Sequence, residues 1–183
     1  MRAFVAIDLP DEVLGSLEAF QADLSATGAD LKAVERQNLH FTVKFLGEIS
    51  EAQAAEARSR LSLLEMKSAD VDVKGVGAFP SVGRPRVVWA GVAPEHEGLI
   101  GPIARNVVDA LGDIGESEER PFQAHITLGR VRSLRNVKEL GELLRRNSGR
   151  PFGSVTLSEV KLKSSVLTPQ GPIYRDVGVF RLK

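Results

Sequence analysis

Hydrophobic and polar positions follow two rhythms along the chain. Residues 2–9 are rich in β-branched and aromatic side chains and predict a strand. Pro10 then opens a segment whose apolar residues recur every three or four positions, and this spacing predicts a helix. The apolar positions of that helix are Val13, Leu17, Phe20 and Leu24.

The same two rhythms predict the remaining elements. Strands are expected over 31–35, 71–79, 86–92, 155–166 and 174–182, and helices over 51–65, 95–112 and 136–146. Ser50 and Gln53 stand at the positions of a capping box before the second helix. Turns are expected at 80–85 and 168–172, and a polar loop at 112–120.

Two further strands carry the same motif. Residues 40–43 read His-Phe-Thr-Val and residues 125–128 read His-Ile-Thr-Leu. Successive side chains of a strand point to opposite faces, so the histidine and the threonine of each motif share one face. On this alternation Phe41, Val43 and Phe45 face the interior.

The repeated motif predicts phosphate chemistry. The unperturbed pKa of histidine lies near neutral pH, so two imidazoles can supply one acid and one base. His40, Thr42, His125 and Thr127 would together form a donor-rich socket of the size of a phosphate. Strand alternation places Lys44 on the His40 face, where it could meet a substrate phosphate or simply face solvent.

The two motifs stand 85 positions apart, close to half of the 183 residues. Each follows a helix-and-strand unit and precedes a helix. We therefore expect one domain over 1–183, a duplicated, bilobal α+β unit. Two antiparallel sheets would flank a central cleft, with the helices outside.

Composition narrows the class of protein. The chain is 43% hydrophobic and 26% charged, which is typical of a globular domain. It has no cysteine, which excludes disulfides and cysteine-ligated metals and fits a cytoplasmic location. The first residues do not form a signal peptide, and no apolar run has the length of a membrane span.

The net charge of zero is unevenly distributed. Residues 130–183 contain 12 Lys and Arg against 4 Asp and Glu, an excess of eight positive charges. A basic C-terminal third could meet a polyanion. The alternative is a set of solvated faces whose ion-pair partners lie elsewhere in the chain.

Other catalytic sites fit the sequence poorly. Zinc sites need three or four ligands, and the chain has neither cysteines nor a His-X-His or His-Glu-X-X-His motif. Neither a Gly-X-Ser-X-Gly elbow nor a phosphate-binding Gly-X-X-X-X-Gly-Lys loop is present. The third histidine, His96, lies between two glutamates and is expected at the surface. We therefore expect neither metal nor cofactor.

The two motifs resemble the signatures of the two-histidine phosphoesterase superfamily. The surrounding sequence is similar to the RNA 2′,3′-cyclic phosphodiesterases, also called 2′-5′ RNA ligase-like proteins. The resemblance covers essentially the whole chain. Its further segments are residues 2–9, 35–39, 45–48, 77–80, 86–92, 120–122 and 165–174.

This resemblance implies hydrolysis of a terminal RNA 2′,3′-cyclic phosphate to a 2′-phosphate without metal. It assigns His40 as proton donor and His125 as acceptor, an order that the symmetric motif alone leaves open. Joining of tRNA halves through a 2′-5′ linkage and a monomeric state are further expectations. The weaker candidate Arg130 would bind substrate, although alternation places it on the opposite face. A non-catalytic nucleotide- or RNA-binding module and a phosphodiesterase for a small cyclic nucleotide are the alternatives.

Overall fold

A computed structural model describes residues 1–117 and 119–183. Within these residues the fold is α+β, with four α-helices and one nine-stranded antiparallel sheet. The strand order is β7-β4-β5-β6-β3-β1-β8-β9, and β2 pairs with β6. The strands are β1 Arg2–Asp8, β2 Leu31–Ala33, β3 His40–Glu48, β4 Ala69–Ser81, β5 Arg84–Val92, β6 Ile126–Val131, β7 Pro151–Leu157, β8 Glu159–Thr168 and β9 Gly171–Arg181.

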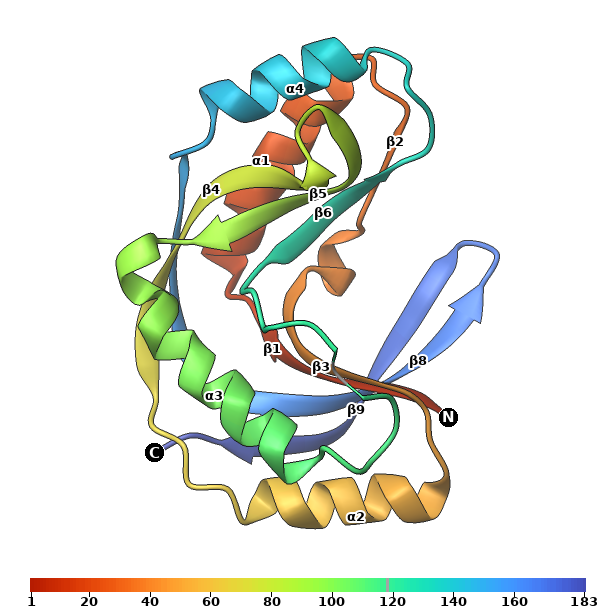
Figure 1. Cartoon of the computed structure of the whole chain (residues 1–183), viewed down its shortest axis with the longest axis vertical. Coiled ribbons are helices and arrows are strands. Elements are labelled where there is room, and N and C mark those ends of the chain that lie inside the picture. The colour runs from red at the N-terminus through yellow and green to blue at the C-terminus, as the bar shows by residue number, and fades with distance from the viewer. Residues whose placement is uncertain (118) are drawn as a thin grey trace.

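The sheet has two parts, which we call half-sheets. The upper half-sheet contains β7, β4, β5, β6 and β2, and the lower half-sheet contains β3, β1, β8 and β9 (Figure 1). The two motif strands join them, because β3 pairs with β6 at Phe41 and Ile126. The prediction of two separate sheets is therefore wrong, since this pairing makes the hydrogen-bonded sheet continuous.

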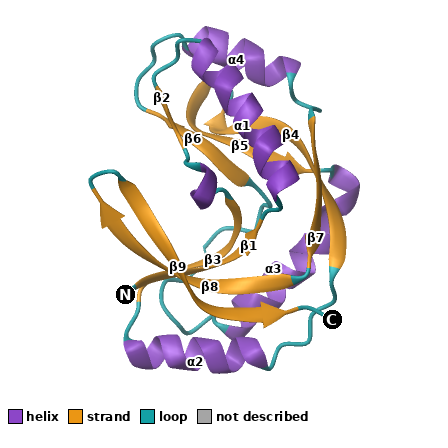
Figure 2. Cartoon of the chain, turned by 180° about the vertical axis from the view of Figure 1, so that it is seen from behind, coloured by secondary structure: helices purple, strands orange, loops and turns teal. Residues whose placement is uncertain are grey.

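Helices cover the outer faces of both half-sheets (Figure 2). Helices α1 (Asp11–Ala26) and α4 (Val137–Arg146) lie with the upper half-sheet, and α2 (Glu51–Ser62) lies against the lower. Helix α3 (Glu97–Ala110) contacts both β3 and β4. The four apolar positions predicted for α1 are all fully buried, and both hydrogen bonds of the Ser50–Gln53 capping box are present. No helix of the described chain is both long and apolar enough to cross a membrane.

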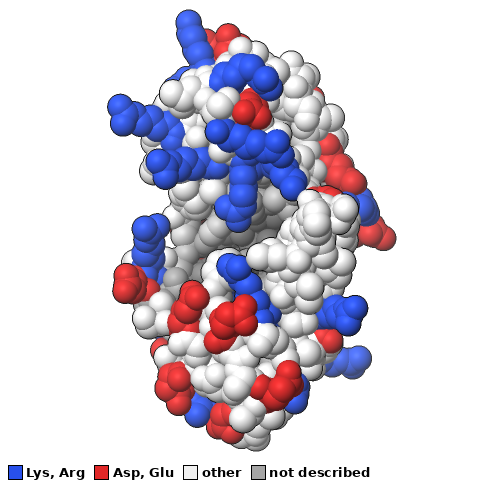
Figure 3. Space-filling model, turned by 90° about the vertical axis from the view of Figure 1, so that its right-hand side faces the viewer, with Lys and Arg blue, Asp and Glu red and all other residues white. Residues whose placement is uncertain are grey.

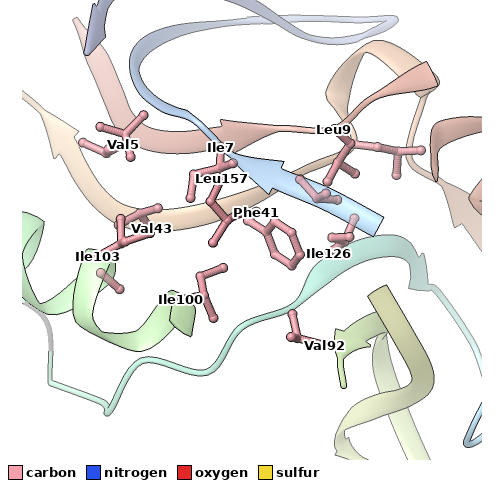
Figure 4. Packing of buried hydrophobic residues seen from close by; sticks show 14 of the residues in the cluster. Val5, Ile7, Leu9, Phe41, Val43, Val92, Ile100, Ile103, Ile126 and Leu157 are labelled. Atoms are coloured by element: carbon pink, nitrogen blue, oxygen red, sulfur yellow. The ribbon is translucent and has the colours of Figure 1, made fainter. Parts of the chain in front are cut away.

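The apolar core runs beneath the junction of the half-sheets. Figure 4 shows Phe41 between Ile126 and Ile100, and Ile103 of α3 beside Val43. None of these five side chains is more than 3% exposed. Burying such a side chain stabilises the fold by about 1.5–3 kcal/mol, so α3 fixes the two motif strands against one another.

The C-terminal third differs from its sequence prediction. The single strand expected over 155–166 is two strands, β7 and β8, which break at Ser158. In β7 the buried Val155 and Leu157 stand at odd positions, whereas in β8 the buried Val160 and Leu162 stand at even positions. Where these buried positions change from odd to even, the chain crosses from the upper to the lower half-sheet.

Candidate active site

A cavity of about 620 Å³ lies between the half-sheets. Both motifs reach it, because His40 and Thr42 line one side and Thr127 and Arg130 the other. Figure 3 shows the hollow in the surface, with Lys and Arg side chains on its upper rim. The structure therefore brings two segments 85 positions apart in sequence to one space.

His40 begins β3 and lies among aromatic side chains. Its ring stacks on Phe4 at 5.1 Å between centroids, and Tyr174 meets it edge-on at 5.6 Å. The imidazole Nε2 lies 3.0 Å from the hydroxyl oxygen of Thr42. The predicted shared face of histidine and threonine is thus a direct hydrogen bond in the first motif.

Burial controls the protonation of His40. Desolvation and the nearby Lys163 ammonium lower the pKa of His40 to about 4, although a hydrogen bond to the backbone of Asn38 and the charge of Asp8 act in the opposite direction. The His40 imidazole is therefore neutral at pH 7 in the free protein.

A compact group of charges lies beside His40. Asp8 pairs with His40 across β1 and β3. Lys163 lies 3.0 Å from Asp8 and 2.8 Å from Asp176, and Lys161 lies 2.8 and 3.0 Å from the same two carboxylates. Burial alone would raise the pKa of Asp8, but hydrogen bonds from both lysines outweigh it and lower that pKa. Asp8 is therefore an acidic partner from outside the C-terminal third for both lysines, although Lys163 is buried and does not form the solvated face that the second interpretation of the charge distribution expected.

His125 precedes β6 and has different surroundings. Its Nδ1 lies 2.8 Å from the carbonyl oxygen of Gln123, and Phe79 meets the ring edge-on at 5.1 Å. A carbonyl only accepts hydrogen bonds, so Nδ1 carries the proton and Nε2 of the neutral ring keeps its lone pair. His125 is not among the described residues that line the cavity, whereas Thr127 of the same motif is.

The predicted position of Lys44 is wrong. Lys44 is 1% exposed and Phe45 is 57% exposed, the reverse of the expected alternation. The β1–β3 pairing skips one residue at Val43 and another at Leu46, and each β-bulge reverses the faces of the residues that follow it. Phe45 therefore lines the cavity, and Lys44 lies inside the protein.

Lys44 forms a hydrogen bond with the segment that precedes His125 in the chain. Its Nζ donates a hydrogen bond to the carbonyl oxygen of Glu116 at 3.0 Å. Gly115 has φ +71°, and a Cβ there would lie 2.0 Å from the Leu46 carbonyl oxygen. Only glycine fits this close approach, so the loop is held tightly against the end of β3.

Arg130 also departs from simple alternation. The β5–β6 pairing skips one residue at Leu128, and this bulge turns Arg130 to the face of Thr127. Arg130 follows Thr127 by three positions, as Phe45 follows Thr42, and both line the cavity. The motifs thus share a bulge as well as their sequence.

Several cavity residues were not predicted from the sequence. Phe4, Tyr174 and Lys32 line the cavity, and none belongs to a repeated motif. Bulges and long-range pairing place such residues, and a single sequence shows neither. The remaining histidine, His96, accepts a hydrogen bond from the Asp72 backbone at 2.9 Å and is partly exposed, as expected for a residue at the surface.

Within 1–117 and 119–183, no group of three or more His, Cys, Asp or Glu side chains could hold a metal ion. Metal independence of the reaction stays a prediction.

Comparison with known proteins gives the family. The model of the LigT-like phosphoesterase family matches twice in succession, over residues 7–89 and 91–174. This chain belongs to the LigT-like phosphoesterases. Each match to the family model contains one of the two His-X-Thr motifs.

Individual relatives of this LigT-like chain cover it almost completely. It is 40% identical over 180 residues to the RNA 2′,3′-cyclic phosphodiesterase of Archaeoglobus fulgidus, covering 98% of this chain and 99% of the relative. It is 37% identical over 184 residues to the protein of that name from Methanothermobacter thermautotrophicus, covering 100% and 99%. Among solved structures, E. coli LigT in its apo form has a TM-score of 0.79 and 26% identity, covering 100% of this chain and 97% of that one.

Proposed function

We propose that this protein hydrolyses the 2′,3′-cyclic phosphate at the end of an RNA to a 2′-phosphate, with His40 and His125 as acid and base. One observation carries the proposal: two His-X-Thr motifs from opposite halves of the chain meet at one cavity. Binding alone could use lysine or arginine, whereas two titratable rings supply proton donor and acceptor together.

The reaction needs two proton transfers. Water attacks phosphorus in line with the 3′-oxygen, and the bond between phosphorus and that oxygen breaks. His125 accepts the proton of water through Nε2, and His40 donates a proton to the leaving 3′-oxygen. The hydroxyls of Thr42 and Thr127 hold the phosphoryl oxygens as their charge grows. The products are a 2′-phosphate and a free 3′-hydroxyl.

The surroundings of the histidines support this division of roles. Because Nδ1 of His125 donates to the Gln123 carbonyl, its Nε2 is the free, basic nitrogen. His40 is neutral in the free protein, so its role as acid requires that the substrate raises its pKa. An anionic phosphate beside the ring acts in that direction, since an opposite charge stabilises the imidazolium.

The relatives support the substrate class. Proteins up to 40% identical over nearly the whole chain bear the name RNA 2′,3′-cyclic phosphodiesterase, and E. coli LigT, at 26% identity, has been solved with 3′-AMP. The same two histidines, in the same roles, would join a 2′,3′-cyclic end to a 5′-hydroxyl that attacks in place of water, which gives a 2′-5′ linkage and a free 3′-hydroxyl; the reverse cleavage exchanges the two roles. We therefore propose reversible ligation, with tRNA halves as candidate partners, by a cytoplasmic monomer built from a duplicated, bilobal unit.

One experiment tests the activity and its alternatives. An RNA that ends in 2′,3′-cyclic phosphate is incubated with the protein in EDTA, and the product terminus is identified by chromatography of the terminal nucleotide against 2′-phosphate and 3′-phosphate standards. We expect a 2′-phosphate. An intact substrate would overturn the enzymatic proposal, restoration by a divalent ion would overturn metal independence, and turnover confined to mononucleotides would indicate a small cyclic nucleotide as substrate.

A further inference from the structure

One pair of basic residues on the cavity wall is arranged unusually. Lys32 of β2 and Arg130 of β6 are direct partners in the strand pairing. Side chains at such positions have Cβ atoms about 5 Å apart, and like charges directly opposite one another repel. The fold holds these two cations side by side where a neutral pair would be more stable.

The two cations have no carboxylate within ion-pair distance among residues 1–117 and 119–183, although Glu35 and Glu116 also line the cavity. By contrast, Arg36 is paired with Asp11 and Glu18, and Arg150 with Asp23. Lys32 and Arg130 both line the cavity, where the Lys and Arg side chains of Figure 3 gather.

The strand positions give the distance between the reacting phosphate and the Lys32–Arg130 pair. Thr127 and Arg130 lie on the same strand, separated by two regular steps and one bulged residue, or about 7 Å along β6. Lys32 lies one strand further out. A phosphate held by Thr42 and Thr127 is therefore about one ribose away from the Lys32–Arg130 pair.

We propose that Lys32, together with Arg130, binds the phosphodiester that links the terminal nucleotide to its 5′ neighbour. This inference rests on the proposed function, because it takes the cyclic phosphate to lie at the two threonines. Arginine binds phosphate oxygens in a bidentate fork and lysine adds a point charge, so the pair fits one phosphodiester. The protein would then select oligonucleotides over mononucleotides at its active site.

The test compares a mononucleotide with a dinucleotide. We measure kcat/KM on adenosine 2′,3′-cyclic phosphate and on the adenosine dinucleotide with the same cyclic end. In Lys32→Met the dinucleotide-to-mononucleotide ratio should fall about tenfold, as expected for one lost phosphate contact, and Lys32→Arg should restore most of it. Lys138→Met removes an exposed lysine of α4 outside the cavity and should leave the ratio unchanged.

A neutral linkage makes the test specific to charge. The dinucleotide is also prepared with a methylphosphonate in place of the linking phosphodiester. With the methylphosphonate dinucleotide, the wild-type protein should show the same low dinucleotide-to-mononucleotide ratio that Lys32→Met shows with the phosphodiester. Lys32→Met should not lower this ratio any further. If Lys32→Met lowered kcat/KM equally for the phosphodiester and the methylphosphonate dinucleotide, the proposal would be overturned. A dinucleotide-to-mononucleotide ratio near one in the wild-type protein would also overturn it.

A binding measurement separates this inference from the proposed reaction. Affinity for the dinucleotide ending in a 2′-phosphate is measured by calorimetry, with phosphodiester and methylphosphonate linkages. If no cyclic phosphate is hydrolysed, the proposed function fails. The subsite is still supported if the wild-type protein binds the methylphosphonate dinucleotide more weakly than the phosphodiester dinucleotide and Lys32→Met binds the two equally. Equal affinities for the two linkages in the wild-type protein would rule it out.

Discussion

The two His-X-Thr motifs are nearly identical in sequence and differ in their surroundings. His40 lies between Phe4 and Tyr174, beside the ionic cluster of Asp8 and Lys163. His125 stands just before β6, where Phe79 meets its ring edge-on and its Nδ1 lies beside the Gln123 carbonyl. A symmetric pair of side chains thus occupies an asymmetric site, and acid–base catalysis requires that asymmetry because its two proton transfers run in opposite directions.

The difference arises from the halves of the sheet that hold each ring. Strands β1 and β8 place Asp8 and Lys163 next to His40. β6 has β5 and β2 as its other neighbours, and these bring Trp89 and Lys32 to its side. Equal motifs therefore acquire unequal surroundings from non-equivalent neighbouring strands.

The largest expected effect distinguishes the acid from the base. His40→Ala and His125→Ala should each lower kcat about 10²–10⁴-fold on an oxygen substrate. A cyclic substrate with sulfur at the 3′ bridging position releases a thiolate, which leaves without protonation. His40→Ala should therefore recover on the sulfur substrate, and His125→Ala should not.

Two controls accompany this measurement. His96→Ala changes the histidine outside the cavity and should keep wild-type turnover of both substrates. The double variant of His40 and His125 should lose little more than either single variant, because the pair acts as a unit. Recovery of His125→Ala instead of His40→Ala would exchange the two roles.

An intermediate effect concerns stability against acid. The pKa of His40 is about 4 in the folded protein and about 6.5 in an unfolded chain. Between these values the unfolded chain binds more protons, so stability should fall as pH falls from 6.5 to 4, by on the order of 3 kcal/mol from this group. Urea unfolding at several pH values measures it, and His40→Gln should flatten the dependence while His96→Gln should not. Equal slopes for wild type and His40→Gln would contradict the burial argument.

The smallest effect tests the ionic cluster. Lys163 follows burial as the cause that lowers the pKa of His40. Lys163→Met removes this positive charge, while Lys161 still pairs with Asp8 and Asp176. The pKa of His40, followed by NMR titration of its ring protons, should rise toward its ordinary value. The exposed Lys138→Met is the matched control, and an unchanged pKa in Lys163→Met would show that desolvation alone governs His40.

The sequence predicted the elements and the motifs well, because both depend on local periodicity. The apolar positions of α1, the Ser50 cap and the shared face of His40 and Thr42 are as expected. The errors concern long-range pairing. A bulge at Val43 buries Lys44, and one at Leu128 turns Arg130 into the cavity. No local pattern shows where a strand will skip a residue relative to its partner.

The prediction of two separate sheets was wrong for a similar reason. The duplicated pattern suggests two separate sheets, but whether their edge strands meet depends on side chains that close the gap between them. Phe41 and Ile126 provide one register pair, and α3 covers it. The break at Ser158 was hidden because buried positions continue on both sides of it.

This narrow connection has a mechanical consequence. The β3–β6 pairing has one register pair, while β1–β3 and β8–β9 are paired along their length. Within the lower half-sheet the strands are joined by long runs of pairing. The two half-sheets are joined by one register pair between the motif strands and by the packing of α3, so this connection should deform more easily than either half-sheet. Movement at this connection changes the distance between the two imidazoles before it breaks the pairing within either half-sheet. Rising temperature should therefore disturb the alignment of His40 and His125 before the protein unfolds.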